Sequence, residues 1–187
     1  MNAKDLLLQA WSYPAEKLTL REIMKRAKKN TKPWVFRSVK AFCKNGVLVE
    51  SRLDSLCLYQ ISNTSSALSL YTYVRGLLLT QSVQTLFAQT NLATRGCLVV
   101  FGSYVRGTQT KNSDLDILAI VDSSYIAQAQ ATLAETSYKS LLRLDVHVFS
   151  KQDFLKMLAQ KEDNLGKQIV QNHIVLQNPH FFYELIA

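Results

Sequence analysis

The sequence predicts an α+β protein with an N-terminal helical module that ends in a hairpin and a C-terminal module with a small mixed sheet. Helical apolar periodicity fills most of the first third of the chain, whereas short apolar strand runs alternate with helical segments in the remainder. The charge divides in the same way: residues 1–63 contain 12 lysines and arginines against 5 acidic residues, and residues 64–187 contain 10 against 9. We therefore expect three regions, at residues 1–63, 64–92 and 93–187.

Start and stop signals define the elements of the first region. Thr19 precedes Glu22 by three residues, which is the spacing of a capping box at a helix start. Thr31 is a suitable N-cap for the next helix, and Gly46 is a typical stop signal. Two runs of strand-forming residues follow, joined at Asp54. The expected elements are helices over 5–13, 19–28 and 31–45 and strands over 47–53 and 56–61.

This order of elements resembles a winged helix-turn-helix across residues 1–63. The resemblance implies that the third helix enters the DNA major groove and that the hairpin forms the wing. Four cations lie on or beside that helix and would neutralise phosphates: Lys32, Arg37, Lys40 and Lys44. Double-stranded DNA is therefore one expected partner. The same basic face also suits a protein-binding or dimerising module, so an oligomer is compatible with the sequence.

The middle region predicts one long or two short helices over 64–92, with Ser65 or Ser66 as the cap and Gly76 as a break. Strands and helices then alternate as far as an apolar C-terminal tail. The expected strands span 97–101, 116–121 and 141–149, and the expected helices span 125–137, 151–160 and 164–172.

A turn that follows the first of these strands has the composition of a phosphate-binding turn. Gly102 allows the backbone to approach a ligand closely, and Ser103 offers a hydroxyl and an amide at the start of a helical turn. Arg106 adds a positive charge one turn later, where we expect it to contact phosphate. Gly107 permits a sharp exit from the turn.

Carboxylates follow the turn in a pattern that favours a metal site. Asp114 and Asp116 share one face of a strand and repel each other unless a cation joins them. Oxygen ligands of this kind suit Mg²⁺ or Mn²⁺. Asp145, on the polar face of a later strand, is the candidate third ligand, with an ion pair to Arg143 across strands as the alternative. His147 shares that face and is expected as a polar partner.

The spacing of these residues resembles the signature of the DNA polymerase β-like nucleotidyltransferase superfamily. Gly102 and Ser103 are followed, after ten residues, by Asp114-x-Asp116. The Gly-Ser-x-x-Arg-Gly form of the turn is similar to the minimal nucleotidyltransferase type. The resemblance covers residues 80–187.

The resemblance implies a role for each of these residues. Gly102 and Ser103 would hold the triphosphate of a nucleotide, for which ATP is expected. Asp114 and Asp116 would bind the divalent metal, and the third acidic residue, matched here by Asp145, would also help to activate the attacking hydroxyl. The expected reaction is the metal-dependent transfer of a nucleoside monophosphate from a nucleoside triphosphate to an acceptor hydroxyl, with release of pyrophosphate.

The acceptor and the activity leave alternatives open. Minimal nucleotidyltransferases of this type resemble antitoxins that adenylylate a partner protein, and a small alcohol is a second possible acceptor. The rival hypothesis is a DNA-binding transcriptional regulator whose nucleotidyltransferase-like domain senses nucleotide or is inactive. Sequence alone leaves both hypotheses in place.

Composition excludes some other classes of protein. The longest apolar segment, Leu68 to Leu79, is too short for a bilayer and contains an arginine, and the N-terminus lacks the pattern of a signal peptide. We therefore expect a cytoplasmic protein with no membrane partner. The three cysteines, Cys43, Cys57 and Cys97, are widely spaced, which argues against a disulfide framework or a zinc site.

Overall fold

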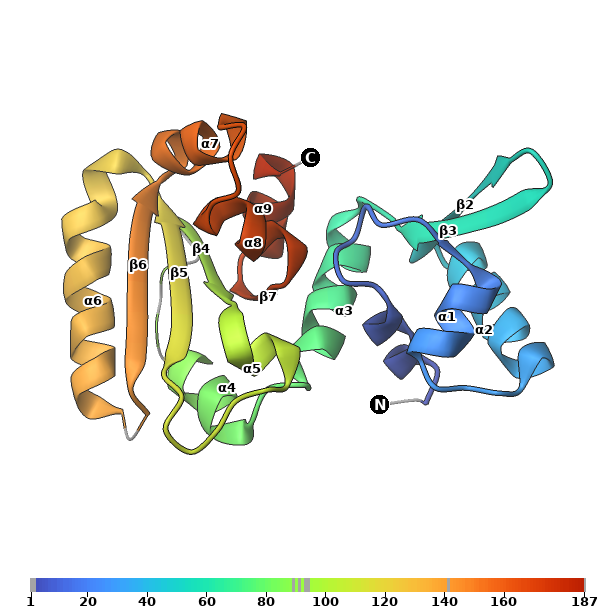
Figure 1. The fold of residues 1–187 in the computed structure, drawn as a ribbon, viewed down its shortest axis with the longest axis horizontal. Helices are drawn as coiled ribbons and strands as arrows, with labels where there is room; N and C mark the ends of the chain where they lie inside the picture. The colour runs from blue at the N-terminus through green and yellow to red at the C-terminus, as the bar shows by residue number, and fades with distance from the viewer. Residues whose placement is uncertain (1–2, 89, 91, 93–94, 141, 187) are drawn as a thin grey trace. The chain divides into compact units, whose positions relative to one another are not determined.

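The chain divides into two compact units, Met1–Arg75 and Gly76–Ala187, which we describe separately (Figure 1). The structure is a computed structural model that describes residues 3–88, 90, 92, 95–140 and 142–186. Its helices and its mixed sheet confirm the α+β class.

The first unit contains a small antiparallel sheet in the order β1-β3-β2 together with its helices. Its elements are η1 (Asp5–Ala10), β1 (Leu18–Thr19), α1 (Leu20–Arg26), α2 (Lys32–Lys44), β2 (Leu48–Leu53), β3 (Leu56–Ile61) and α3 (Ser65–Gly76). The winged-helix interpretation of these elements stays a prediction.

Local signals account for the helices of this unit. The Thr19 hydroxyl accepts from the Glu22 amide, and the Glu22 carboxylate accepts from the Thr19 amide, so the capping box is confirmed. Thr31 does precede α2, but its side chain makes no capping hydrogen bond. The first segment is a 3₁₀-helix that ends at Ala10, which is shorter than the expected helix over 5–13.

The second unit contains a four-stranded sheet in the order β6-β5-β4-β7. Its elements are α4 (Gln81–Ala88), β4 (Gly96–Val100), α5 (Gly102–Arg106), β5 (Leu115–Val121), η2 (Ser123–Tyr125), α6 (Ile126–Lys139), β6 (Leu144–Ser150), α7 (Lys151–Ala159), α8 (Leu165–Gln171), β7 (Ile174–Gln177) and α9 (Pro179–Leu185). The expected strand over 141–149 begins at Leu144, and residue 141 lies outside the described residues.

The connections of this sheet follow from its strand directions. β5 and β6 are parallel, so they need a crossover connection, which α6 provides alongside them (Figure 1). β4 is antiparallel to both β5 and β7. Every residue of β4 is buried, which agrees with its continuous apolar run. The C-terminal tail forms β7 and α9, neither of which the sequence predicted.

No helix among the described residues is both long enough and apolar enough to cross a membrane.

Candidate functional site

The turn between β4 and α5 brings the backbone against a carboxylate. Gly102 has φ +70°, a conformation that side chains other than glycine rarely adopt. A Cβ atom at this position would lie 1.8 Å from Oδ2 of Asp116. Glycine is therefore needed twice, once for the backbone angle and once because the Asp116 carboxylate packs directly on its Cα atom.

Asp116 is the most constrained carboxylate of this site. It lies on β5, where the amide of Phe101 donates to its backbone carbonyl over 3.1 Å. Partial burial raises the pKa of the Asp116 carboxyl, and the negative charge of Asp145 raises it further. A hydrogen bond from the Ser103 amide lowers that pKa, and the nearby charges of His147 and Arg106 act in the same direction.

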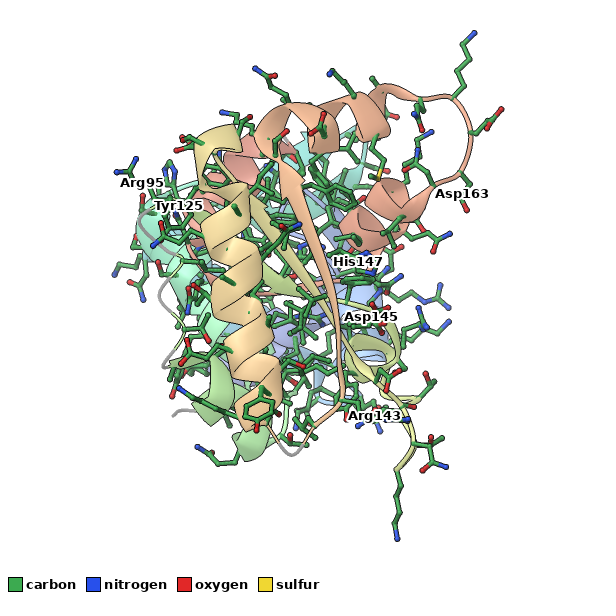
Figure 2. The ribbon with its side chains drawn as sticks, turned by 90° about the vertical axis from the view of Figure 1, so that its left-hand side faces the viewer. Arg95, Tyr125, Arg143, Asp145, His147 and Asp163 are labelled. Atoms are coloured by element: carbon green, nitrogen blue, oxygen red, sulfur yellow. The ribbon has the colours of Figure 1, made fainter. Side chains whose placement is uncertain are left out.

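Asp145 lies directly beside Asp116 because β5 and β6 run parallel in a register that pairs the two residues. Neighbouring strands lie about 4.8 Å apart, and paired residues on one face project in the same direction. Figure 2 shows Arg143, Asp145 and His147 following one another along the β6 segment. The His147 Nε2 atom lies 3.4 Å from Oδ2 of Asp145, which agrees with its expected role as a polar partner.

Arg143 pairs with Asp114 rather than with Asp145, the partner that the sequence suggested. Asp114 immediately precedes β5, and its Oδ1 atom lies 2.9 Å from Nε of Arg143. The Arg143 guanidinium also donates to the backbone carbonyl of Asn112. The sequence had offered Arg143 as a partner for Asp145. Alternation along β6 placed Arg143 and Asp145 on one face, but only the pairing with β5 shows that Asp114 lies next to Arg143.

The expected nucleotide-binding residues gather at this turn. Arg106 lies in the last turn of α5, and its charge acts on the Asp116 carboxyl, so the two side chains belong to one site. The Ser103 amide is already bonded to Asp116, which leaves the Ser103 hydroxyl as the group available for a ligand. Gly107 ends α5 with φ +69°.

Aromatic rings extend the site along β6. The ring of His147 lies 5.8 Å from that of Phe101 and 6.4 Å from that of Phe149, the second pair being nearly parallel at 13°. The contact between His147 and Phe149 follows from their alternation on β6, whereas the contact with Phe101 depends on how the sheet brings the end of β4 near β6, which the sequence does not reveal. The rings give the site a partly apolar wall beside its carboxylates.

The donor set fits a divalent cation. Two carboxylates side by side, one of them partly buried, repel each other, and an oxygen-seeking dication relieves that repulsion. The tight approach of Gly102 to Asp116 forms a cradle that a Cβ atom would fill. Among the described residues, no three histidine, cysteine or acidic side chains lie close enough together to form a metal-binding group. Asp114, which is held by Arg143, would have to move to join the other two.

The four predicted DNA contacts lie on one helix of the first unit. At helical spacing, Lys32, Arg37, Lys40 and Lys44 share the exposed side of α2. Lys40 pairs with Glu50 of β2 and also lies 5.7 Å from the centre of the Phe36 ring. The charge of Lys40 is therefore partly compensated within the fold.

Comparisons with known proteins give a family match for part of the second unit. Residues 87–176 match the family model described as "Nucleotidyltransferase domain". That range contains the turn at Gly102 and all three candidate carboxylates. The match supports the nucleotidyltransferase part of the sequence prediction.

A solved structure described as "Crystal structure of the toxin-antitoxin with AMP-PNP" is also similar to part of this chain. It shares 19% sequence identity, and the match covers 57% of this chain and 85% of that chain, with a TM-score of 0.33. No curated protein matched the sequence.

Proposed function

We propose that the second unit is a metal-dependent nucleotidyltransferase, which transfers a nucleoside monophosphate from a nucleoside triphosphate to an acceptor hydroxyl. The observation that carries the proposal is the pairing of Asp116 with Asp145 beside the Gly102–Ser103 turn. The family match over residues 87–176 supports the same reaction class.

The proposed step is a displacement at the α-phosphorus atom of the nucleotide. The acceptor hydroxyl oxygen forms a bond to that phosphorus, and the bond from the phosphorus to the bridging oxygen of pyrophosphate breaks. Asp145, whose side chain is 55% exposed, takes up the proton of the hydroxyl. The Ser103 hydroxyl and the Arg106 guanidinium hold the leaving phosphates through hydrogen bonds and charge.

Asp116 and Asp145 would hold the divalent cation, Mg²⁺ or Mn²⁺, with Asp114 as a third ligand. When bound, the cation supplies positive charge that offsets the phosphate and carboxylate charges. Arg143 forms an ion pair with Asp114 in the structure, so Asp114 would exchange this partner for the cation. Gly102 fixes the position of Asp116 by direct contact, so the turn and the carboxylates act as one unit.

The acceptor that we propose is a hydroxyl group on a partner protein, with ATP as the donor. Asp145 is open to solvent rather than enclosed, so a hydroxyl carried on a large molecule can reach it. A small alcohol would use the same geometry and is the second acceptor to test.

The test is transfer of label from each of the four α-labelled nucleoside triphosphates, in the presence of Mg²⁺, to proteins or to small alcohols. We expect Asp116→Asn to lower the transfer rate by about 100-fold or more, because it removes a group that acts on the reacting centre. The matched control is Asp122→Asn. Asp122 is an exposed acidic residue that follows the same strand and makes no capping hydrogen bond through its side chain.

Transfer that survives in Asp116→Asn at the level of Asp122→Asn would contradict the proposal. Circular dichroism of both variants separates a loss of chemistry from a loss of fold. Calorimetric titration with a non-hydrolysable nucleotide adds a binding measurement that does not depend on finding the acceptor.

The rival prediction, a DNA-binding regulator with an inactive second unit, gives a different pattern. It requires salt-sensitive binding to duplex DNA that is unchanged in Asp116→Asn, together with no label transfer to any acceptor. Measurements on the unaltered protein and on Asp116→Asn therefore decide between the nucleotidyltransferase and the DNA-binding regulator.

A further inference from the structure

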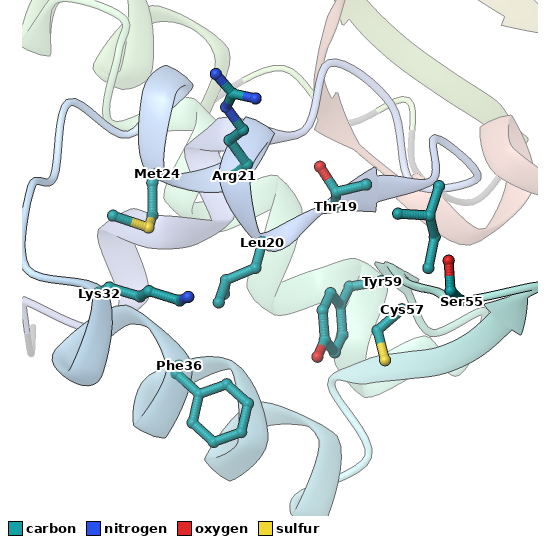
Figure 3. A pocket seen from close by; sticks show the side chains of 10 residues that line it. Thr19, Leu20, Arg21, Met24, Lys32, Phe36, Ser55, Cys57 and Tyr59 are labelled. Atoms are coloured by element: carbon teal, nitrogen blue, oxygen red, sulfur yellow. The ribbon is translucent and has the colours of Figure 1, made fainter.

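A groove in the first unit combines an apolar floor with positive charge at its edge. It lies between α1, α2 and the β2–β3 hairpin and has a volume of about 570 Å³. Leu20, Met24, Phe36 and Tyr59 are among its lining residues (Figure 3). Leu56 also lines it. All of its lining residues belong to the first unit, whereas the residues of the proposed transfer site belong to the second.

The charge of the groove has one sign. Arg21 and Lys32 line it, and no described lining residue is acidic. Figure 3 shows the Lys32 ammonium group directed toward Leu20, across the apolar floor, whereas the Arg21 guanidinium group points away from it. Within the described part of the chain, neither cation has an ion-pair partner.

The apolar surface continues beyond the groove onto exposed side chains. Phe36 on α2 is 44% exposed, and the cross-strand pair Leu53 and Leu56 at the end of the hairpin is 60% and 53% exposed. Large exposed apolar side chains gathered around one opening indicate a surface that another molecule covers. An open surface of this extent suits a polypeptide better than an enclosed small ligand.

We infer that this groove binds an acidic segment of a partner protein that presents bulky apolar side chains beside its carboxylates. The apolar groups of such a segment would cover Phe36 and Leu56, and a carboxylate of the segment would pair with Lys32, which extends over the floor. The complementary charge is what selects this occupant, because Lys32 extends over the floor and no described residue that lines the groove is acidic.

Two other occupants fit these observations less well. The phosphate backbone of DNA has no apolar surface to cover Phe36, Leu53 and Leu56, so it would use the cations alone. A second copy of the chain would bring like charges together, because residues 1–75 contain 13 lysines and arginines against 5 acidic residues.

The experiment uses the full chain in anisotropy titrations with two fluorescent probes and one fluorescent control peptide. One probe is a synthetic helical peptide with leucine and phenylalanine on one face and glutamate elsewhere. The other is a DNA duplex of random sequence. A scrambled peptide of the same composition keeps the charge but loses the apolar face, so it separates groove binding from charge attraction.

Four variants locate the binding surface. Phe36→Ser removes an exposed apolar contact, and Leu56→Ser repeats that test on a different element in case the first variant folds poorly. Lys32→Glu reverses a lining charge, and Lys44→Glu is its matched control on the same helix, outside the groove lining. Circular dichroism verifies the fold of each variant.

We expect the amphipathic peptide to bind the unaltered protein and the scrambled peptide to bind at least about tenfold more weakly. Phe36→Ser, Leu56→Ser and Lys32→Glu should each weaken peptide binding by about tenfold or more, and Lys44→Glu by less than about threefold.

Three results would overturn the inference. The first is failure of the amphipathic peptide to bind, or equal binding of the scrambled peptide. The second is tight duplex binding that falls equally in Lys32→Glu and Lys44→Glu and is unaffected by Phe36→Ser, which assigns this face to nucleic acid. The third is self-association in sedimentation that Phe36→Ser abolishes, which assigns the groove to a second copy.

Discussion

Replacing Gly102 by alanine, in comparison with the same change at Gly107, separates the two reasons for a glycine at position 102. An alanine at φ +70° costs about 1–2 kcal/mol of folding free energy, because its Cβ atom approaches the following carbonyl oxygen. The same Cβ atom would lie 1.8 Å from Oδ2 of Asp116, whereas real Cβ contacts are essentially never below 3.0 Å. The carboxylate must therefore move by more than 1 Å, and a displacement of that size in a reacting site costs roughly 100-fold in rate.

Gly107 provides the matched control for this substitution. Its φ is +69°, and a Cβ atom there would meet no other atom within 4 Å. Gly107→Ala should therefore lower the free energy of unfolding by about 1–2 kcal/mol, from backbone strain alone, and leave nucleotide transfer within a few-fold of the unaltered rate. Urea unfolding measures the first quantity, and label transfer under saturating nucleotide measures the second. Equal transfer rates in Gly102→Ala and Gly107→Ala would refute the idea that Gly102 positions Asp116.

Three further predictions address other contacts. Arg143→Ala should tighten Mn²⁺ binding in the absence of nucleotide by about two- to fivefold, because it frees Asp114 from an exposed ion pair. Electron paramagnetic resonance titration measures the Mn²⁺ affinity. Lys111→Ala, which removes the same charge, is the control. Glu22→Ala should cost about 1 kcal/mol of stability at pH 7. Hydrogen bonds from Thr19 lower the pKa of the Glu22 carboxyl in the folded state, so this contribution is complete above the unfolded pKa and is lost as pH falls through the folded pKa. The denaturation midpoints of Glu22→Ala and of the unaltered protein should therefore converge at acid pH. A difference between the midpoints that does not change with pH would contradict the role of the Glu22 carboxylate in the capping box. Burial raises the pKa of the Cys97 thiol to about 12, so thiol reagents at pH 8 should label Cys97 only after unfolding, as mass spectrometry of the modified peptides can establish.

Elements with strong local signals could be predicted from the sequence, and elements made by distant pairing could not. The capping box at Thr19 and the stop at Gly46 are short-range signals, and α1 and α2 lie within two residues of their expected bounds. β1 has only two residues and exists because it pairs with β3, which lies about forty residues further along the chain. β7 likewise depends on β4, so an apolar tail was all that its sequence indicated.

The candidate site shows the same division between local and distant information. The Gly102 turn and the alternation of carboxylates are local, so the sequence was sufficient to nominate them. The register of β5 on β6 is not local, and it decides which carboxylates meet. In the observed register Asp116 lies opposite Asp145, and Arg143 lies where it pairs with Asp114. A shift by one residue would move the side chains of β6 to the other face of the sheet and separate the acidic pair.

This register also predicts that the fold is more stable without its acidic pair. Like charges on neighbouring strands are destabilising, and burial adds to the cost at Asp116, as the raised pKa of its carboxyl indicates. Asp145→Asn should therefore raise the free energy of unfolding by about 0.5–1 kcal/mol in metal-free buffer at pH 7, while it abolishes transfer. Asp122→Asn removes the same charge from an exposed position beyond β5 and should change stability by less than that. Added Mg²⁺ should reverse the order, because a cation that joins the carboxylates stabilises the unaltered protein more than Asp145→Asn. If Asp145→Asn is less stable than the unaltered protein in metal-free buffer, contacts within the fold stabilise the acidic pair and the pair does not need a cation.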